Sequence, residues 1–184
     1  MHANEYLWEV GRIAEAIDPE GIERMAAALS KVEGRVYCIG LGGSLANAIH
    51  MAADFRKLCH IDAHAPNQAE MSAWINDSGT PFAFDGFLGR IGEQDALFVL
   101  SVGGGEHAGV SPSIPYAIQQ AKRNNAKVFG IVGPTGGVTA ERGDYVIKIP
   151  APKERVTPHT EAFQAVIWHC LVSHPLLQKQ ATKW

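Results

Sequence analysis

The sequence lacks a long hydrophobic run, a surplus of basic residues and a secretory leader, and each absence excludes a class of protein. No apolar run approaches the roughly 18 residues that span a membrane, and the first ten residues lack a basic-then-apolar signal pattern. The 16 basic and 19 acidic residues give a net charge of −3, without the basic excess expected of a nucleic-acid binder. We therefore expect a soluble cytoplasmic protein with no membrane and no nucleic-acid partner.

Cysteine is also scarce. The three residues, Cys38, Cys59 and Cys170, are widely spaced and lie in apolar stretches, so we interpret them as reduced core residues rather than as a disulfide framework. The hydrophobic share of 46% excludes disorder. At about 150 residues per domain, the length predicts one domain over 1–184 that needs no disulfide or metal to fold.

Short apolar strands alternate with helical patterns along the chain. A helical pair is predicted over 1–32, ahead of an α/β core over 33–184, and such a pair often packs on a partner subunit. Strands are predicted at 35–40, 96–101, 127–132 and 145–149, with a weaker one at 61–65, and helices at 44–57, 68–74, 112–125 and 161–178. Strands that are apolar throughout, each followed by a turn and a helix, indicate a parallel sheet covered on both faces.

The 19 glycines concentrate in three clusters, each directly after a predicted strand. The clusters are at 40–43, 103–105 and 133–137. Because parallel strands end at one edge of a sheet, the clusters should lie together, beside helix N-termini whose N–H groups suit phosphate. Any one cluster alone is as well explained by a tight turn, but three that converge favour an anion site. The loops carry no dinucleotide or Walker fingerprint and no Lys or Arg, so we predict one phosphate held by neutral donors.

The second glycine loop is unusually long. It extends over 102–112, whereas a connection from a strand to a helix usually takes about 2–6 residues. It is either a substrate lid or a mere insertion, and we favour the lid.

Two positions offer acid–base or metal chemistry. His50 and Asp54 are four residues apart and therefore share a helix face, where they form either a metal or acid–base pair or an ordinary surface pair. His169 lies in an apolar stretch, where an imidazole needs a ligand or a hydrogen bond. It is either part of a site or a core histidine bonded to a carbonyl.

The segment from Cys38 to Asp54 resembles the sugar isomerase (SIS) domain family, of the sedoheptulose-7-phosphate isomerase type. The family has Gly-Asn-Gly-Gly-Ser, then Asp-Ala, then a His and a Glu four apart. The matching residues are Gly40, Gly42, Gly43, Ser44, Ala48 and His50, whereas Leu41, Asn47 and Asp54 replace the family's Asn, Asp and Glu. Further along, Asn76-Asp77 matches a substrate-contacting pair, Glu161 stands at a Gln, and His169 matches a His. The resemblance covers about residues 5–175.

The resemblance implies a three-layer α/β/α sandwich and a homotetramer with active sites between subunits. It implies conversion of sedoheptulose 7-phosphate to a heptose 7-phosphate for surface-polysaccharide synthesis, with zinc at the site. His50, Asp54, Glu161 and His169 become the zinc ligands by this resemblance, and Asp54 and His169 the proton-transfer pair. The substrate-binding residues become Leu41, Gly42, Gly43, Ser44, Asn76, Asp77, Ser101, Val102, Gly103, Ser111 and Glu161.

Helical spacing limits this ligand set. Interconverting a ketose and an aldose through an enediol needs a base, an acid and stabilised oxyanion charge, which a carboxylate, an imidazole and a metal supply. Glu161 and His169, however, are eight residues apart, or about 12 Å along a helix. We therefore predict that different subunits contribute to each site, or that one of the two residues is not a ligand.

Departures from the family pattern leave two alternatives open. The family's phosphate loop, Ser-Thr-Ser-Gly-x-Ser, is replaced by a longer glycine-rich loop with fewer hydroxyls, and Asp54 is one methylene shorter than Glu. A carboxylate at Glu161 attracts a cation and repels phosphate. The alternatives are an isomerase for another sugar phosphate and a sugar-phosphate-binding SIS module without catalysis.

Overall fold

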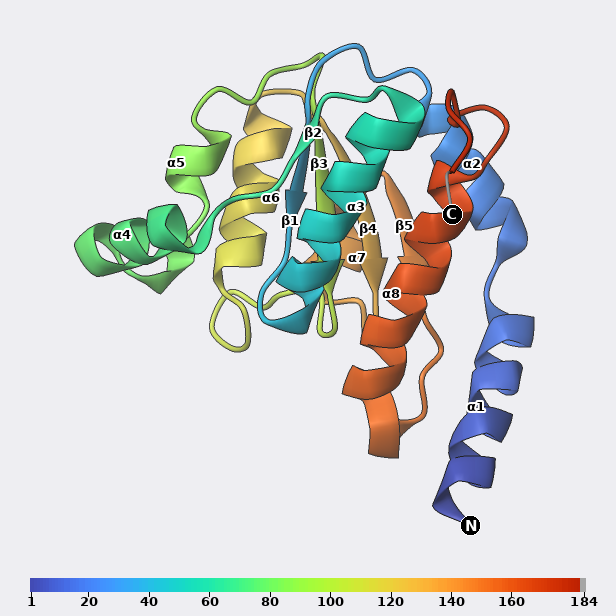
Figure 1. The fold of residues 1–184 in the computed structure, drawn as a ribbon. Helices are drawn as coiled ribbons and strands as arrows, with labels where there is room; N and C mark the ends of the chain where they lie inside the picture. The colour runs from blue at the N-terminus through green and yellow to red at the C-terminus, as the bar shows by residue number, and fades with distance from the viewer. Residues whose placement is uncertain (183–184) are drawn as a thin grey trace.

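The computed structural model describes residues 1–182, and its centre is a five-stranded parallel sheet in the order β2-β1-β3-β4-β5 (Figure 1). The strands are β1 (Val36–Ile39), β2 (Ala63–His64), β3 (Ala96–Ser101), β4 (Lys127–Val132) and β5 (Tyr145–Lys148). Every neighbouring pair is parallel, which confirms the predicted α/β class. β3 and β4 have the predicted bounds, whereas the edge strand β2 is shorter than predicted because it pairs only with Val36 and Tyr37.

Helices cover both faces of the sheet. They are α1 (His2–Ala16), α2 (Pro19–Leu29), α3 (Gly43–Cys59), α4 (Gln68–Ser78), α5 (Asp85–Leu88), α6 (Ser113–Arg123), α7 (Gly137–Arg142) and α8 (Val156–Val172). α2, α3 and α8 pack on one face and α5, α6 and α7 on the other, which confirms the three-layer sandwich. Within the described residues, no helix is both long and apolar enough to cross a membrane.

Each strand contributes to two separate core layers. Val36, Cys38 and Phe98 pack in the layer under α2, α3 and α8, whereas their neighbours Tyr37 and Val99 pack in the layer under α6. Successive side chains of a strand point to opposite faces, so a strand buried on both faces is apolar at every position. This explains why the strands could be predicted from continuous apolar runs.

The cysteines follow the prediction in two cases of three. Cys38 and Cys59 are buried, and burial raises the pKa of the Cys59 thiol to about 11. Cys170 is exposed, so its assignment to the core is wrong. It lies on the side of α8 that faces the groove next to α1, where it does not reach the sheet.

The last helix begins five residues before the predicted start at Glu161 and ends at Val172 rather than near Gln178. Pro158 falls in the first turn of α8, where the missing N–H has no helical partner to lose, so it does not delay the helix. Pro175 disfavours the helical conformation of the residue before it, so the helix ends before it reaches 178.

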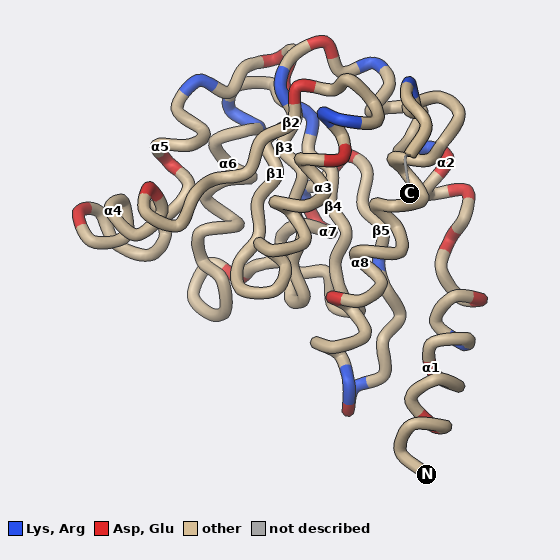
Figure 2. Tube along the Cα trace, viewed as in Figure 1, with Lys and Arg blue, Asp and Glu red and all other residues tan. Residues whose placement is uncertain are grey.

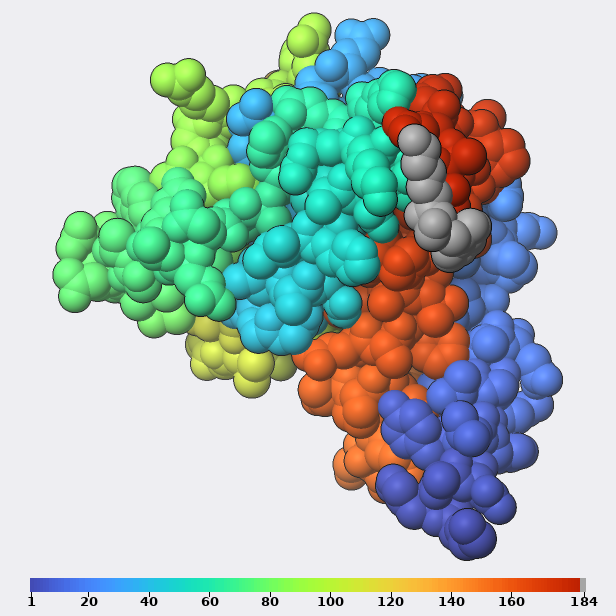
Figure 3. Space-filling model, in the orientation of Figure 1, coloured from blue at the N-terminus to red at the C-terminus, as the bar shows by residue number. Residues whose placement is uncertain are grey.

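A charged cluster fixes α1 to the start of α8. Arg155 donates from Nε to Glu9 Oε2 at 2.7 Å, and His159 Nε2 lies 2.7 Å from the same oxygen. The ring of Tyr6 stacks on the buried ring of His159 at 4.3 Å. Hydrogen bonds from Arg155, and then from His159, lower the pKa of Glu9 from 4.5 to about 2. Because of this cluster, α1 lies along the lower half of α8 and extends past the sheet (Figures 1 and 3).

We expect this cluster to make stability depend on pH in the acid range. A carboxylate whose pKa is depressed on folding stabilises the protein above its unfolded pKa, and that stabilisation is lost as pH falls from 4.5 towards 2. In urea unfolding at pH 5, 4 and 3, Glu9→Gln should therefore lose less stability on acidification than the parent protein. Glu15→Gln, at an exposed position of the same helix, is the control and should follow the parent. Parallel pH profiles for Glu9→Gln and the parent would contradict the expectation.

Candidate active site

The glycine clusters lie at the carboxyl edge of the sheet, as predicted. They directly follow β1, β3 and β4, and this edge also carries the starts of α3, α6 and α8 (Figure 1). Figure 2 shows that Lys, Arg, Asp and Glu concentrate at the opposite, amino edge. Glu106 is the one Asp, Glu, Lys or Arg residue in the loop 102–112. The donors near the carboxyl-edge loops are thus mainly backbone N–H groups and hydroxyls.

In the first loop, the backbone turns sharply into α3. Gly42 has a φ of +57°, and its carbonyl accepts hydrogen bonds from the N–H groups of Leu45 and Ala46. Gly40 packs against the first turn of α3 so closely that a Cβ there would lie 2.6 Å from the Ser44 carbonyl. The N–H groups of Gly43 and Ser44 form no hydrogen bond within residues 1–182, so they are free to bind a ligand.

Glu161 lies at the N-terminus of α3. A Cβ added to Gly43 would come within 2.5 Å of Glu161 Oε2, which places the carboxylate directly against the loop. A carboxylate is favourable at a helix N-terminus, but its charge repels a phosphate. The first loop therefore suits the hydroxyl groups of a sugar better than a phosphate.

The second and third glycine clusters bond to each other. The carbonyls of Gly104 and Gly105 accept hydrogen bonds from the N–H groups of Thr139 and Val138, at the start of α7. The Val102 carbonyl accepts from Gly133 N–H at 3.0 Å. These bonds use the N–H of Gly133 but otherwise N–H groups of α7, so the contribution of the third cluster to an anion site remains a prediction.

The start of α6 offers hydroxyl and backbone donors. The Ser113 hydroxyl is buried and has no hydrogen-bond partner among the described residues. The neighbouring Ser111 has a φ of +57°, and its carbonyl accepts from Ile114 N–H. A buried polar group without a partner calls for a ligand or water, and helix N-termini favour anions. Of the three loops, this one suits a phosphate best.

Of the residues predicted to bind substrate in the second loop, Ser101 lies at the base of the loop and Gly103 on its open side. The Ser101 hydroxyl accepts a hydrogen bond from Gly104 N–H at 3.0 Å and so shapes the turn. A Cβ on Gly103 would meet nothing within 4 Å, so this residue borders open space. The tip of the loop turns back on itself, with Glu106 N–H bonded to the Val110 carbonyl. Its function as a lid remains a prediction.

His50, Asp54 and His169 meet where α3 and α8 lie side by side. One ligand atom from each lies within 4.8 Å of the others, and His50 Nε2 is 3.6 Å from Asp54 Oδ2. His169 is exposed, so the alternative of a core histidine is wrong. Its Nδ1 lies 2.8 Å from the Ala165 carbonyl, which leaves Nε2 for a ligand or proton.

The donor set of this cluster fits zinc. Catalytic zinc sites have three protein ligands from His and carboxylate groups and an open fourth position. Two imidazoles and a carboxylate, mostly open to solvent, provide such a set. Glu161 does not belong to the cluster in its own chain, since it lies against Gly43, about 10 Å from His50 along α3. The role of Glu161 as a ligand thus remains a prediction.

Comparison with known proteins shows the family of the chain. No protein-family model matches the chain. Phosphoheptose isomerase from Leptospira biflexa is 32% identical over 152 residues, which cover 78% of this chain and 74% of the relative. The chain belongs to the phosphoheptose isomerase family. The lincomycin biosynthesis protein LmbN of Streptomyces lincolnensis is 31% identical over 183 residues, and the match covers 66% of that protein.

Solved structures share the fold of this family member. The phosphoheptose isomerase from Neisseria gonorrhoeae superposes with a TM-score of 0.81 at 22% identity, covering 93% of this chain and 95% of that one. The Vibrio vulnificus NanR protein complexed with ManNAc-6P has a TM-score of 0.66 at 15% identity, and 59% of that protein is covered. These two similarities concern the fold alone.

Two residues of this chain that were predicted to bind substrate lie apart from the cluster of His50, Asp54 and His169. Asn76 and Asp77 are exposed on α4, and Asn76 Nδ2 donates to Asp77 Oδ1 at 2.9 Å. α4 stands out on the side of the molecule away from α8 (Figures 1 and 3). One chain therefore does not bring this pair to the His50 cluster, and its role in binding remains a prediction.

Three residues of the site were not predicted. Trp168 is fully buried under the cluster and meets the ring of His50 edge-on at 4.7 Å. Gln164 and Asn47 form hydrogen bonds between α8 and α3. Asn47 was identified from the sequence as a replaced family position but was given no role, whereas Gln164 and Trp168 gave no signal because their importance depends on the packing of two helices.

The contact between the glycine loops predicts a large loss of stability for Gly104→Ala. Gly104 has a φ of +77°, and an alanine Cβ would overlap the Gly136 carbonyl, a backbone group that cannot rotate away. We expect a loss of at least about 2 kcal/mol in unfolding free energy, measured by urea denaturation. Gly103→Ala is the matched control, because its Cβ would meet open space, and it should stay within about 0.5 kcal/mol of the parent. Equal stability of the two variants would disprove the packing argument.

Proposed function

We propose that this protein is a phosphosugar ketose–aldose isomerase that converts sedoheptulose 7-phosphate to a heptose 7-phosphate, for heptose-containing surface polysaccharides. The observation that carries the proposal is the cluster of one carboxylate and two imidazoles between α3 and α8, on helices that begin at the edge where two loops offer free donors. Membership of the phosphoheptose isomerase family supports the choice of substrate.

The reaction moves a proton between neighbouring carbons through an enediol. Asp54 has the role of the base, because its carboxylate can take the proton from the carbon next to the carbonyl and return it to the neighbouring carbon. His169 Nε2 carries a proton between the two oxygens, since Nδ1 is held by the Ala165 carbonyl. Asp54 is half-buried beside His50, which limits the movement of its carboxylate.

The two loops divide the substrate between them. The phosphate binds at the start of α6, where Ser111, Ser113 and the N–H groups of the first turn are the donors. The sugar end lies at the first loop, where Gly43 and Ser44 donate and the Glu161 carboxylate accepts from sugar hydroxyls. This division keeps the phosphate away from Glu161, as electrostatics requires.

Zinc belongs to the proposal as a cofactor held by His50, Asp54 and His169. When bound, a zinc ion polarises the carbonyl and stabilises the charge that develops on its oxygen. Asp54 has two oxygens and can both hold the ion and accept a proton. His169 offers only Nε2, so at any moment this atom either holds the ion or carries a proton. Glu161 completes the ligand set only if another subunit brings it to the cluster.

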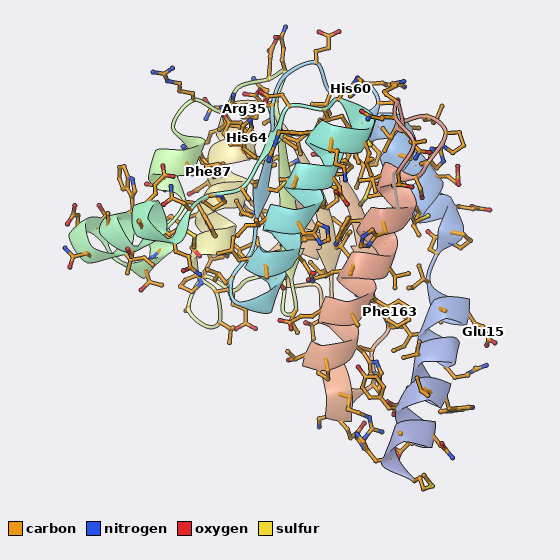
Figure 4. The ribbon with its side chains drawn as sticks, viewed as in Figure 1. Glu15, Arg35, His60, His64, Phe87 and Phe163 are labelled. Carbon is orange, nitrogen blue, oxygen red and sulfur yellow. The ribbon has the colours of Figure 1, made fainter. Side chains whose placement is uncertain are left out.

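A homotetramer with sites between subunits is the proposed assembly. The exposed face of α1 presents Leu7 and Trp8, with 67% and 66% of their surfaces accessible. Between α1, α2 and α8 runs a largely apolar groove, and Figure 4 shows Phe163 of α8 facing α1 there. Apolar surface of this kind favours association with another copy of the chain. A cytoplasmic location is proposed from the free thiols of Cys38 and Cys59.

An isomerase assay in deuterated water tests the reaction. The protein should interconvert sedoheptulose 7-phosphate and an aldose phosphate and place deuterium on the carbon next to the carbonyl. Asp54→Asn should lower kcat by about 10²–10⁴-fold with little change in the melting temperature. A chelator should remove activity, and zinc should restore it. Binding of sugar phosphates without turnover or exchange would favour the non-catalytic binding module instead, and turnover of another sugar phosphate would change the substrate.

Mixing two inactive variants tests whether sites lie between subunits. We expect His169→Ala and Asn76→Ala each to lose most activity, because both residues have proposed roles in the site. In one chain, α4 and α8 lie on different sides of the molecule. If each site takes α4 from one subunit and α8 from another, some sites in mixed tetramers contain neither substitution. Denaturing and refolding the two variants together should then restore up to about a quarter of wild-type activity. A mixture as inactive as its parts would show that each chain has its own complete site.

A further inference from the structure

Three hydrogen bonds between α3 and α8 form a chain that ends on the Ser44 hydroxyl. Asn47 Nδ2 donates to the backbone carbonyl of Glu161 at 2.9 Å and to Gln164 Oε1 at 3.0 Å. Gln164 Nε2 in turn donates to Ser44 Oγ at 3.1 Å. The Gln164 side chain is fully buried, so water does not compete for these bonds.

The bond from Asn47 to the Glu161 carbonyl fixes the donor and acceptor at every step of this series of hydrogen bonds. A backbone carbonyl can only accept, so Asn47 must turn its NH2 group towards Glu161. The same NH2 group faces Gln164, which must present its oxygen there and its own NH2 group to Ser44. Flipping either amide would set two donors or two acceptors against each other.

The Ser44 hydroxyl is thereby made a hydrogen-bond donor. One lone pair of its oxygen accepts from Gln164, and its hydrogen has no acceptor within residues 1–182. Ser44 lies in the first turn of α3, where the N–H groups of Gly43 and Ser44 are also without partners. Three donors therefore lie close together at the loop that the proposed function gives to the sugar.

We propose that Gln164 is a positioning residue, which orients the Ser44 hydroxyl as a donor to an oxygen of the bound sugar. Asn47 fixes the orientation of Gln164. This proposal rests on the isomerase function proposed above and adds to it the polarity of one contact. The site then selects for a sugar oxygen that can accept at this position over a group that can only donate.

A double-substitution cycle separates this role from a purely structural one. Gln164→Met keeps the size of the side chain but removes the donor to Ser44. Gln164→Met and Ser44→Ala should each raise KM for the sugar phosphate about tenfold, and the double variant should be no worse than Ser44→Ala. Because the phosphate binds at α6, the inhibition constant of inorganic phosphate should not change. Gln120→Met, whose amide donates to the Leu88 carbonyl in the other layer, is the matched control and should keep the parent KM.

Each outcome of the cycle decides the proposal. A Gln164→Met variant with KM within twofold of the parent overturns it, as do effects that multiply in the double variant or a weaker inhibition by phosphate. If Gln164→Met does not fold, Gln164→Glu replaces it, since its carboxylate still accepts from Asn47 but cannot donate to Ser44. Gln164→Glu should then raise KM less when it is added to Ser44→Ala than when it is made in the parent protein. An equal rise in both proteins overturns the proposal. A parent protein that turns over no sugar phosphate overturns both this proposal and the isomerase function, whereas normal turnover with an unaffected Gln164 variant overturns this one alone.

Discussion

The parallel packing of α3 on α8 is the contact on which the candidate site depends. Both helices run upward from the carboxyl edge of the sheet and lie side by side where they overlap, so that residues at matching heights meet there (Figure 1). Near the loop, Gln164 meets Ser44, and two turns further along His169 meets His50 and Asp54. The buried Trp168 packs beneath the histidines, with its ring against that of His50. One interface thus carries both the sugar contacts and the acid–base cluster.

The position of the Glu161 carboxylate decides which glycine loop suits a sugar and which suits a phosphate. Glu161 brings a carboxylate to the start of α3, whereas the start of α6 keeps a hydroxyl that has no partner among the described residues. The third loop joins the second through backbone hydrogen bonds and serves as its support. A phosphate and a sugar can therefore bind at the same edge without the phosphate facing Glu161.

The N-terminal helix α1 is held in place mainly by polar interactions, whereas the rest of the fold is held by its apolar core. α1 contributes little to the core, and a buried carboxylate paired with Arg155 and His159 holds it to α8. Its outer side remains apolar at Leu7 and Trp8. The arrangement anchors α1 near its middle and leaves its exposed face available to another chain, in keeping with the proposed assembly.

The sequence by itself determined the parallel sheet, the two helical layers and the position of the glycine loops. Strands buried on both faces are apolar throughout, and such local patterns survive in any tertiary context. The spacing of His50 and Asp54 likewise fixed them on one helix face. Only the tertiary structure decided that His169 is exposed beside them, that Glu161 lies against Gly43 and that Gln164 reaches Ser44. These contacts join residues more than 100 positions apart, and they depend on how two helices pack side by side rather than on any local pattern.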